Sequence, residues 1–233
     1  DEEAKRTNEI KTAIPLLDPI NIQGKVITAD ALLTQRNFAR YLVRKRKAHY
    51  HFTVKANQPT LLSDIKLFFQ NRKQPDHIDH TPPDHGRIET RKIWTTTALN
   101  DYLDFPYVGQ AFIIERHCID KKSAKQSCEI AYGITSQTPQ EAGAKKVLAT
   151  NRGQWSIENS CHYIIDWNYD EDRSRISKGN GPENITRLRR FAVGLIKSKG
   201  VPSVAQKMRQ LTRSVRSVFD YLRMTGNSCP LTK

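Results

Sequence analysis

The sequence predicts an α/β protein, and its pattern of strands and helices changes twice, which suggests three consecutive parts. Over the first 70 residues, short β-branched segments alternate with helical ones, as in parallel α/β layers. From residue 71 to residue 136, strand-like segments follow one another, which indicates an antiparallel insertion. The rest is predicted helical: residues 137–181 complete the α/β core, and residues 182–233 form a basic C-terminal region.

The first part combines three predicted helices with two predicted strands. A helix is expected over Glu9–Leu17, and the β-branched segment Lys25–Ala29 predicts a buried strand. Apolar residues recur at helical spacing in Leu33–Arg46, and Tyr50–Lys55 predicts the second strand. Pro59–Phe69 is expected to be a helix, because proline is favoured in a first helical turn.

The middle part is predicted to begin with a loop and to continue as strands. Asn71–Asp84 is polar and rich in Pro, Asp and His, which favours a loop. Strands are predicted over Arg87–Thr97, Val108–Cys118 and Cys128–Thr135, with turns between them. We therefore expect an inserted antiparallel β subdomain.

Four helices are predicted in the last part. Pro139–Thr150 contains three alanines, and Gln154–Trp167 carries apolar anchors at helical spacing. The other two helices, Pro182–Lys197 and Val201–Met224, are both basic.

Charge is the first strong functional signal. The 233 residues contain 38 Lys and Arg against 24 Asp and Glu, for a net charge of +14 and a pI near 9.7. Such an excess implies an anionic partner, either nucleic acid or an acidic membrane surface. The stretch from Glu183 to Lys233 holds 11 Lys and Arg but only two acids. This shortage of acids favours phosphate contact over the alternative of an ordinary solvated helix face.

Three further features narrow the class of protein. No apolar run approaches the length of a membrane span, and the charged N-terminus does not resemble a signal peptide. The four cysteines lack CxxC spacing, which favours reduced thiols. The loop histidines His77, His80 and His85 fit no zinc-binding pattern. We expect a cytoplasmic protein that binds nucleic acid and not a membrane.

Asp30 is the first candidate for chemistry. It stands directly after a predicted buried strand, and open α/β sheets bind their ligands at the carboxyl ends of strands. The alternative is that Asp30 caps the segment that follows it. One carboxylate can serve both roles.

A polar stripe on the predicted helix Gln154–Trp167 is the second candidate. Glu158, His162 and Asp166 are spaced four residues apart, which places them on one helix face. Such a stripe can also be the solvent-facing edge of a helix. The residues alone leave both possibilities open.

Five segments along most of the chain share the order and spacing of a known family. They are VITADALLTQ at Val26–Gln35, HFTVKANQPTLLSDI at His51–Ile65, HGRIETR at His85–Arg91, YGITS at Tyr132–Ser136 and WSIENSCHYIIDWNYDEDRSRISKGNGPENITRLRR at Trp155–Arg190. With these segments the chain resembles the DDE transposases of bacterial insertion sequences, in the H-repeat-associated group.

The resemblance implies an RNase H-like core in which three carboxylates hold divalent metal, two ions of Mg²⁺ or Mn²⁺, with a β-rich insertion between the second and third acids. Asp30 matches the second acid and Glu158 the third. In the family the first acid lies on a strand before the segment that resembles DEEAKRTNEI. The core is therefore expected to be incomplete, without its first strands and first catalytic Asp, and the chain inactive alone.

The resemblance also implies cleavage and transfer of double-stranded DNA during transposition in a bacterial cytoplasm, with a homodimer as a possible assembly on DNA. His162 would orient Glu158 or contact the scissile phosphate. The expected DNA contacts are basic residues in or near the matching segments: Lys55, Arg87, Arg152, Arg173, Arg175, Lys178, Arg187 and Arg190. The alternatives are a catalytically inactive transposase remnant or a DNA-binding protein without catalysis. An RNA-binding protein is less favoured, because no RNA-recognition signature is present.

Overall fold

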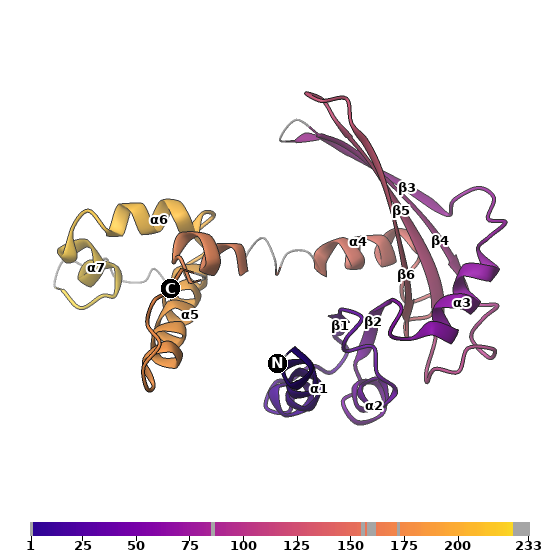
Figure 1. Ribbon diagram of the computed structural model, residues 1–233, viewed down its shortest axis with the longest axis horizontal. Helices are drawn as coiled ribbons and strands as arrows, with labels where there is room; N and C mark the ends of the chain where they lie inside the picture. The colour runs from indigo at the N-terminus through magenta and orange to yellow at the C-terminus, as the bar shows by residue number, and fades with distance from the viewer. Residues whose placement is uncertain (1, 85–86, 155–156, 158–161, 172, 226–233) are drawn as a thin grey trace. The chain divides into compact units, whose positions relative to one another are not determined.

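The computed structural model describes residues 2–84, 87–154, 157, 162–171 and 173–225. The chain divides into two compact units, Asp1–Gln154 and Trp155–Lys233. The first unit is built on a β-sheet with helices on both faces, and the second is helical (Figure 1). In the described part of either unit, no helix is long and apolar enough to span a membrane.

A single six-stranded sheet in the order β1-β2-β6-β5-β4-β3 forms the centre of the first unit. β1 and β2 are parallel, and every other neighbouring pair is antiparallel. Because β6 pairs with both β2 and β5, the strands of the expected insertion continue the sheet that β1 and β2 begin. The strands are β1 Val26–Ala29, β2 His49–Val54, β3 His77–Asp84, β4 Arg87–Thr96, β5 Gln110–Asp120 and β6 Gln126–Thr135. The α/β class predicted from the sequence is confirmed.

Four α-helices accompany the sheet: α1 Glu2–Leu17, α2 Arg36–Arg40, α3 Pro59–Phe68 and α4 Ala144–Gln154. α2 continues into a π-helical turn, η1 Tyr41–Lys45. In Figure 1, α3 and α4 lie on opposite faces of the long strands.

Strand β5 shows how these two faces are filled. Its successive residues alternate between two clusters: Ile113 packs with the α3 side, and Phe112 with Val147 of α4 on the other side. Each buried side chain of this size stabilises the fold by roughly 1.5–3 kcal/mol. Gly133 of β6 makes room for Phe112, since a Cβ there would lie 2.2 Å from the ring atom Cζ. The core thus fills both faces of the sheet.

The expected loop Asn71–Asp84 is partly wrong, because its second half forms strand β3. β3 is antiparallel to β4, with His77 opposite Ile93, and it lies at the edge of the sheet. An edge strand needs hydrogen bonds on one side only, so it tolerates polar residues and prolines that a central strand excludes. The register shifts between Thr81 and Asp84.

Two predicted helices begin later than expected. The segment Leu33–Arg46 becomes helical only at Arg36, because residues 30–34 form a turn. The segment Pro139–Thr150 becomes helical at Ala144. There the Glu141 side chain accepts hydrogen bonds from the N–H and hydroxyl of Thr138, which stabilise a local turn instead of a helix.

The second unit contains η3 Ile164–Asn168, α5 Gly181–Ser198, α6 Val204–Leu211 and α7 Val215–Tyr221. The single helix predicted over Val201–Met224 is wrong, because the chain forms two helices there. Ser203 caps α6 by accepting the N–H of Gln206. Ser214 is extended, with φ −157° and ψ 128°, which interrupts the helix before α7. Within the expected helix Gln154–Trp167, the described segment Ile164–Asn168 is a π-helical turn rather than a regular α-helix.

Candidate active site

Asp30 follows the last residue of β1, and its carboxylate holds the turn that leads to α2. Oδ1 accepts the N–H of Leu32 at 3.1 Å and that of Leu33 at 3.4 Å. This is the capping role that the sequence left open. Asp30 is exposed, and within the described chain its other oxygen, Oδ2, accepts no hydrogen bond. One carboxylate oxygen is therefore fixed and the other is available to a ligand.

Lys55 lies at the same sheet edge as Asp30. β1 and β2 run parallel with Ala29 opposite Phe52, so their carboxyl ends lie side by side. Lys55 comes directly after β2 and is exposed. An anionic and a cationic side chain thus flank the edge at which open α/β sheets bind ligands.

Three residues that the sequence analysis did not single out hold the turn after Asp30. Thr34 is fully buried, and its Oγ1 lies 2.8 Å from the Thr53 carbonyl oxygen and 3.2 Å from that of Asp30. The side-chain amides of Asn57 and Gln58 donate hydrogen bonds to carbonyls of the same turn. All three lie inside matching segments, but their residue types alone indicate no such contact.

The second candidate group falls in the second unit. Glu158 lies outside the described residues, so its approach to Asp30 stays a prediction. His162 is exposed and lies two residues before the π-helical turn η3. π-Helical turns are frequent at functional sites. Among the described residues, no group of three or more His, Cys, Asp or Glu is arranged to hold a metal ion.

Several predicted DNA contacts have acidic partners. Arg152 of α4 pairs with Asp79 of β3 at 3.1 Å, and Arg87 lies opposite Asp120 in the β4–β5 register. Two more pairs are Arg173 with Asp170 and Arg187 with Glu183. Arg175, Lys178 and Arg190 are exposed. Exposed ion pairs contribute about 0–1 kcal/mol, so a phosphate can replace the acidic partner at little cost.

The family model for the transposase DDE domain matches residues 2–192 of this chain. The chain belongs to the DDE transposase family.

Curated relatives confirm the H-repeat-associated group. The chain is 31% identical to "Putative transposase YncI" of Escherichia coli O157:H7 over 82% of its own length. It is 27% identical to "H repeat-associated putative transposase YhhI" and 28% identical to "Putative protein YbfL", both of E. coli K12, over 96% of its length. The chain spans 50% of YncI and 61% of each of the other two relatives.

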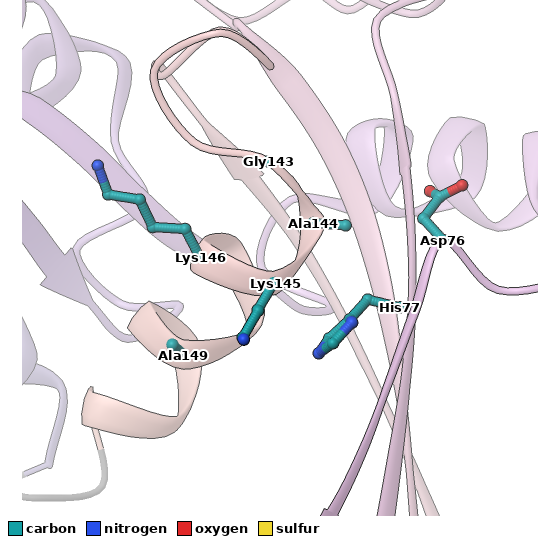
Figure 2. A pocket seen from close by; sticks show the side chains of 7 residues that line it. All are labelled: Asp76, His77, Gly143, Ala144, Lys145, Lys146 and Ala149. Carbon is teal, nitrogen blue, oxygen red and sulfur yellow. The ribbon is translucent and has the colours of Figure 1, made fainter.

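A cleft between α4 and β3 lies elsewhere on the first unit of this DDE-domain chain (Figure 2). In Figure 2, the His77 ring extends from β3 toward Lys145 of α4, whereas the side chains of Asp76 and Lys146 point away from this ring. Asp76 accepts hydrogen bonds from Thr95, and Lys146 donates to a backbone carbonyl. Lys145 and His77 thus line a cleft that is open to solvent. Its other lining residues are Gly143, Ala144 and Ala149.

Proposed function

We propose that this chain is part of a transposase that cuts and rejoins DNA at the ends of an insertion sequence, with Asp30 and Glu158 as metal ligands. The observation that carries the proposal is the exposed Oδ2 of Asp30 at the carboxyl edge of two parallel strands. Mg²⁺ and Mn²⁺ prefer oxygen ligands and keep several waters, so a carboxylate with one free oxygen suits them. Membership of the DDE family supports the assignment.

The chemistry that this site would perform is an in-line displacement at a DNA phosphate. Two divalent ions about 3.5–4 Å apart supply charge stabilisation for the attacking and leaving oxygens. Asp30, fixed by its own turn, would hold its ligand oxygen at a constant place. Lys55 would bind a DNA phosphate at the same edge, and His162 would orient Glu158 or contact the scissile phosphate.

We propose the same architecture that the family resemblance implies. β1, β2, α3 and α4 would belong to an RNase H-like core, and β3 to β6 to its insertion, with boundaries near residues 70, 136 and 181. Double-stranded DNA is the proposed partner, with a homodimer as a possible assembly on it, in the bacterial cytoplasm. The parallel pair β1–β2 followed by antiparallel strands supports this division.

The proposed metal site would need three carboxylates, of which Asp30 and Glu158 match two. Two divalent ions carry four positive charges, which three carboxylates and the substrate phosphate balance. Removing one of these carboxylates would leave one ion held by few protein groups. We therefore expect Asp30→Ala to abolish Mg²⁺-dependent cleavage of a plasmid carrying the element ends. Cleavage that persists in Asp30→Ala would contradict the assignment.

Iron-generated hydroxyl radicals can test the metal site without any activity. Fe²⁺ bound in place of Mg²⁺, with ascorbate and peroxide, cuts the protein backbone near the ion. We expect cuts near residues 30 and 158 that Mg²⁺ suppresses and Asp30→Asn removes, while Asp101→Asn, a change at an exposed acid, leaves them intact. Cuts that persist in Asp30→Asn would contradict the assignment.

The alternative function is that of an inactive transposase remnant, or of another DNA-binding protein without catalysis. Its support is the basic second unit, whose charge suits DNA whether or not a metal is bound. DNA binding that is unaffected by metal, together with an absence of radical cuts near Asp30, would favour this alternative.

A further inference from the structure

We propose that Asn57 and Gln58 are positioning residues whose side-chain amides clamp the turn that carries Asp30. We call this pair the amide clamp. The inference rests on the proposed function, in which Asp30 binds metal, and it assigns a role to residues of a different segment. Neither residue needs to touch metal or DNA, because both would act through the direction of the Asp30 carboxylate.

Side-chain amides hold most of the carbonyls of this turn. Three carbonyl oxygens each accept one amide N–H: Ala31 from Asn57, Leu32 from Gln35, and Thr34 from Gln58. A typical hydrogen bond of this kind contributes about 0.5–1.5 kcal/mol. Together they hold a short, largely irregular segment in one conformation.

The amide clamp forms at the expense of ordinary helix capping. Gln58 occupies the N-cap position of α3, where Ser, Thr, Asp and Asn are preferred because their side chains accept helix N–H groups. The Gln58 side chain makes no cap hydrogen bond and donates instead to Thr34 at 2.9 Å. The Asn57 side chain likewise donates to a carbonyl of the turn, that of Ala31. Positions at which a local preference is overridden are often functional.

The clamp also holds Thr34, the residue through which the Asp30 turn contacts strand β2. Gln58 holds the carbonyl of Thr34, and the buried Thr34 hydroxyl also contacts Thr53 on β2. The same turn presents the N–H groups of Leu32 and Leu33 that fix Oδ1 of Asp30. If the clamp is released, these N–H groups can move and the carboxylate can rotate with them.

Metal ligands must be held within about 0.5 Å, and loss of an outer partner typically weakens metal binding by about 10–100-fold. We therefore expect Gln58→Met and Asn57→Ala to weaken Mn²⁺ binding by about tenfold or more, measured by titration calorimetry on the full chain. The amide hydrogens of Leu32 and Leu33 should exchange faster in both variants. Gln70→Met, the same exchange at an exposed position in the turn that follows α3, is the matched control and should change neither quantity.

The outcomes separate the clamp from the proposed function. If the unaltered chain binds Mn²⁺ and Asp30→Asn abolishes binding, but both clamp variants bind normally, the clamp inference is wrong and the proposed function stands. If exchange at Leu32 and Leu33 accelerates but the unaltered chain binds no Mn²⁺ at Asp30, the metal role of Asp30 is wrong, and the positioning role falls with it. Unchanged exchange in both variants contradicts the clamp directly. A loss of overall thermal stability equal to the loss of binding would indicate a merely structural role.

Discussion

His51 is a buried histidine on β2, the strand next to β1 in the sheet. Its ring stacks on Phe112, with ring centroids 4.7 Å apart, and its Nε2 is buried without a hydrogen-bond partner among the described residues. Burial lowers the pKa of His51 to about 3. The side chain is therefore neutral in the folded protein near pH 7.

This histidine should make the fold sensitive to mild acid. Because the folded pKa lies below the unfolded value of 6.5, the unfolded chain binds a proton first as the pH falls. The contribution to stability is intact above pH 6.5 and is lost progressively as the pH falls toward 3, by roughly 2 kcal/mol at pH 5. We expect His51→Leu to remove this part of the pH dependence in urea unfolding at pH 7.5 and pH 5. An identical pH dependence in the variant would show that His51 is not the sensitive group.

The candidate residues differ in how far the sequence could reveal them. Asp30 was recognisable because a carboxylate directly after a buried strand has a restricted set of roles. Asn57 and Gln58 were not, because their hydrogen bonds reach a turn more than 20 residues away, which only the pairing of β1 with β2 brings near. Side-chain partners across strands depend on tertiary structure and leave little trace in local pattern.

At the scale of elements, the long strands carry charged side chains where the core ends. Glu89 of β4 forms ion pairs with Arg91 on its own strand and Arg116 on β5. Burial raises the pKa of Glu89, but the hydrogen bond from Arg116 and the charge of Arg91 outweigh it, so the pKa lies below its ordinary value. Arg116 also pairs with Glu129 of β6 at 3.0 Å, which links three strands.

Removing the central carboxylate should weaken these strands. We expect Glu89→Gln to lower the free energy of unfolding by about 1–2 kcal/mol, because it leaves two partly buried guanidinium groups without their shared partner. Glu129→Gln is the matched control and should cost less, since this more exposed glutamate pairs with Arg116 alone among the residues that the structure describes. The difference should shrink as the pH falls through the lowered pKa of Glu89, because the protonated carboxyl no longer forms ion pairs. Equal losses in both variants would count against a central role for Glu89.

Element boundaries were predicted well where sequence and local chemistry agreed. The β-branched segment before Asp30 became β1, and Pro59 begins α3 as expected. β3 was missed because its stability comes from pairing with β4 rather than from its own residues. The division between α6 and α7 was missed because a single extended serine, Ser214, interrupts a segment whose composition is helical throughout.

At the scale of the whole molecule, the two units differ in what their charges do. Several arginines of the sheet are engaged by acids on neighbouring strands or helices. The second unit has 14 Lys and Arg against seven acids, and many of its arginines are exposed. Its net charge of +7 equals that of the first unit but is spread over 79 residues instead of 154, so the second unit has the higher density of positive charge.

DNA affinity should reflect this difference. Each phosphate neutralised contributes about 0.9 to the slope of log K against log salt. We expect replacing Arg187, Arg190, Arg209 and Arg213 together by Glu to flatten this slope, measured by fluorescence anisotropy with duplex DNA. A comparison set, Lys121, Lys122 and Lys125 between β5 and β6, should change it less. Equal flattening would indicate a general effect of net charge, and an unchanged slope would mean that the basic helices are a solvated face.

The position of β6 between β2 and β5 has a mechanical consequence. Its last four residues pair with β2 and β5 at once. A force on the far end of β5 or β6 is therefore transmitted to β2 through the backbone of β6 and the hydrogen bonds between the strands. The chain leaving β2 continues through Lys55 to Asn57 and Gln58. A bound duplex that bends the strands β3 to β6 would therefore displace Asn57 and Gln58, which hold the turn that carries Asp30. These two residues precede the start of β3 by some twenty residues.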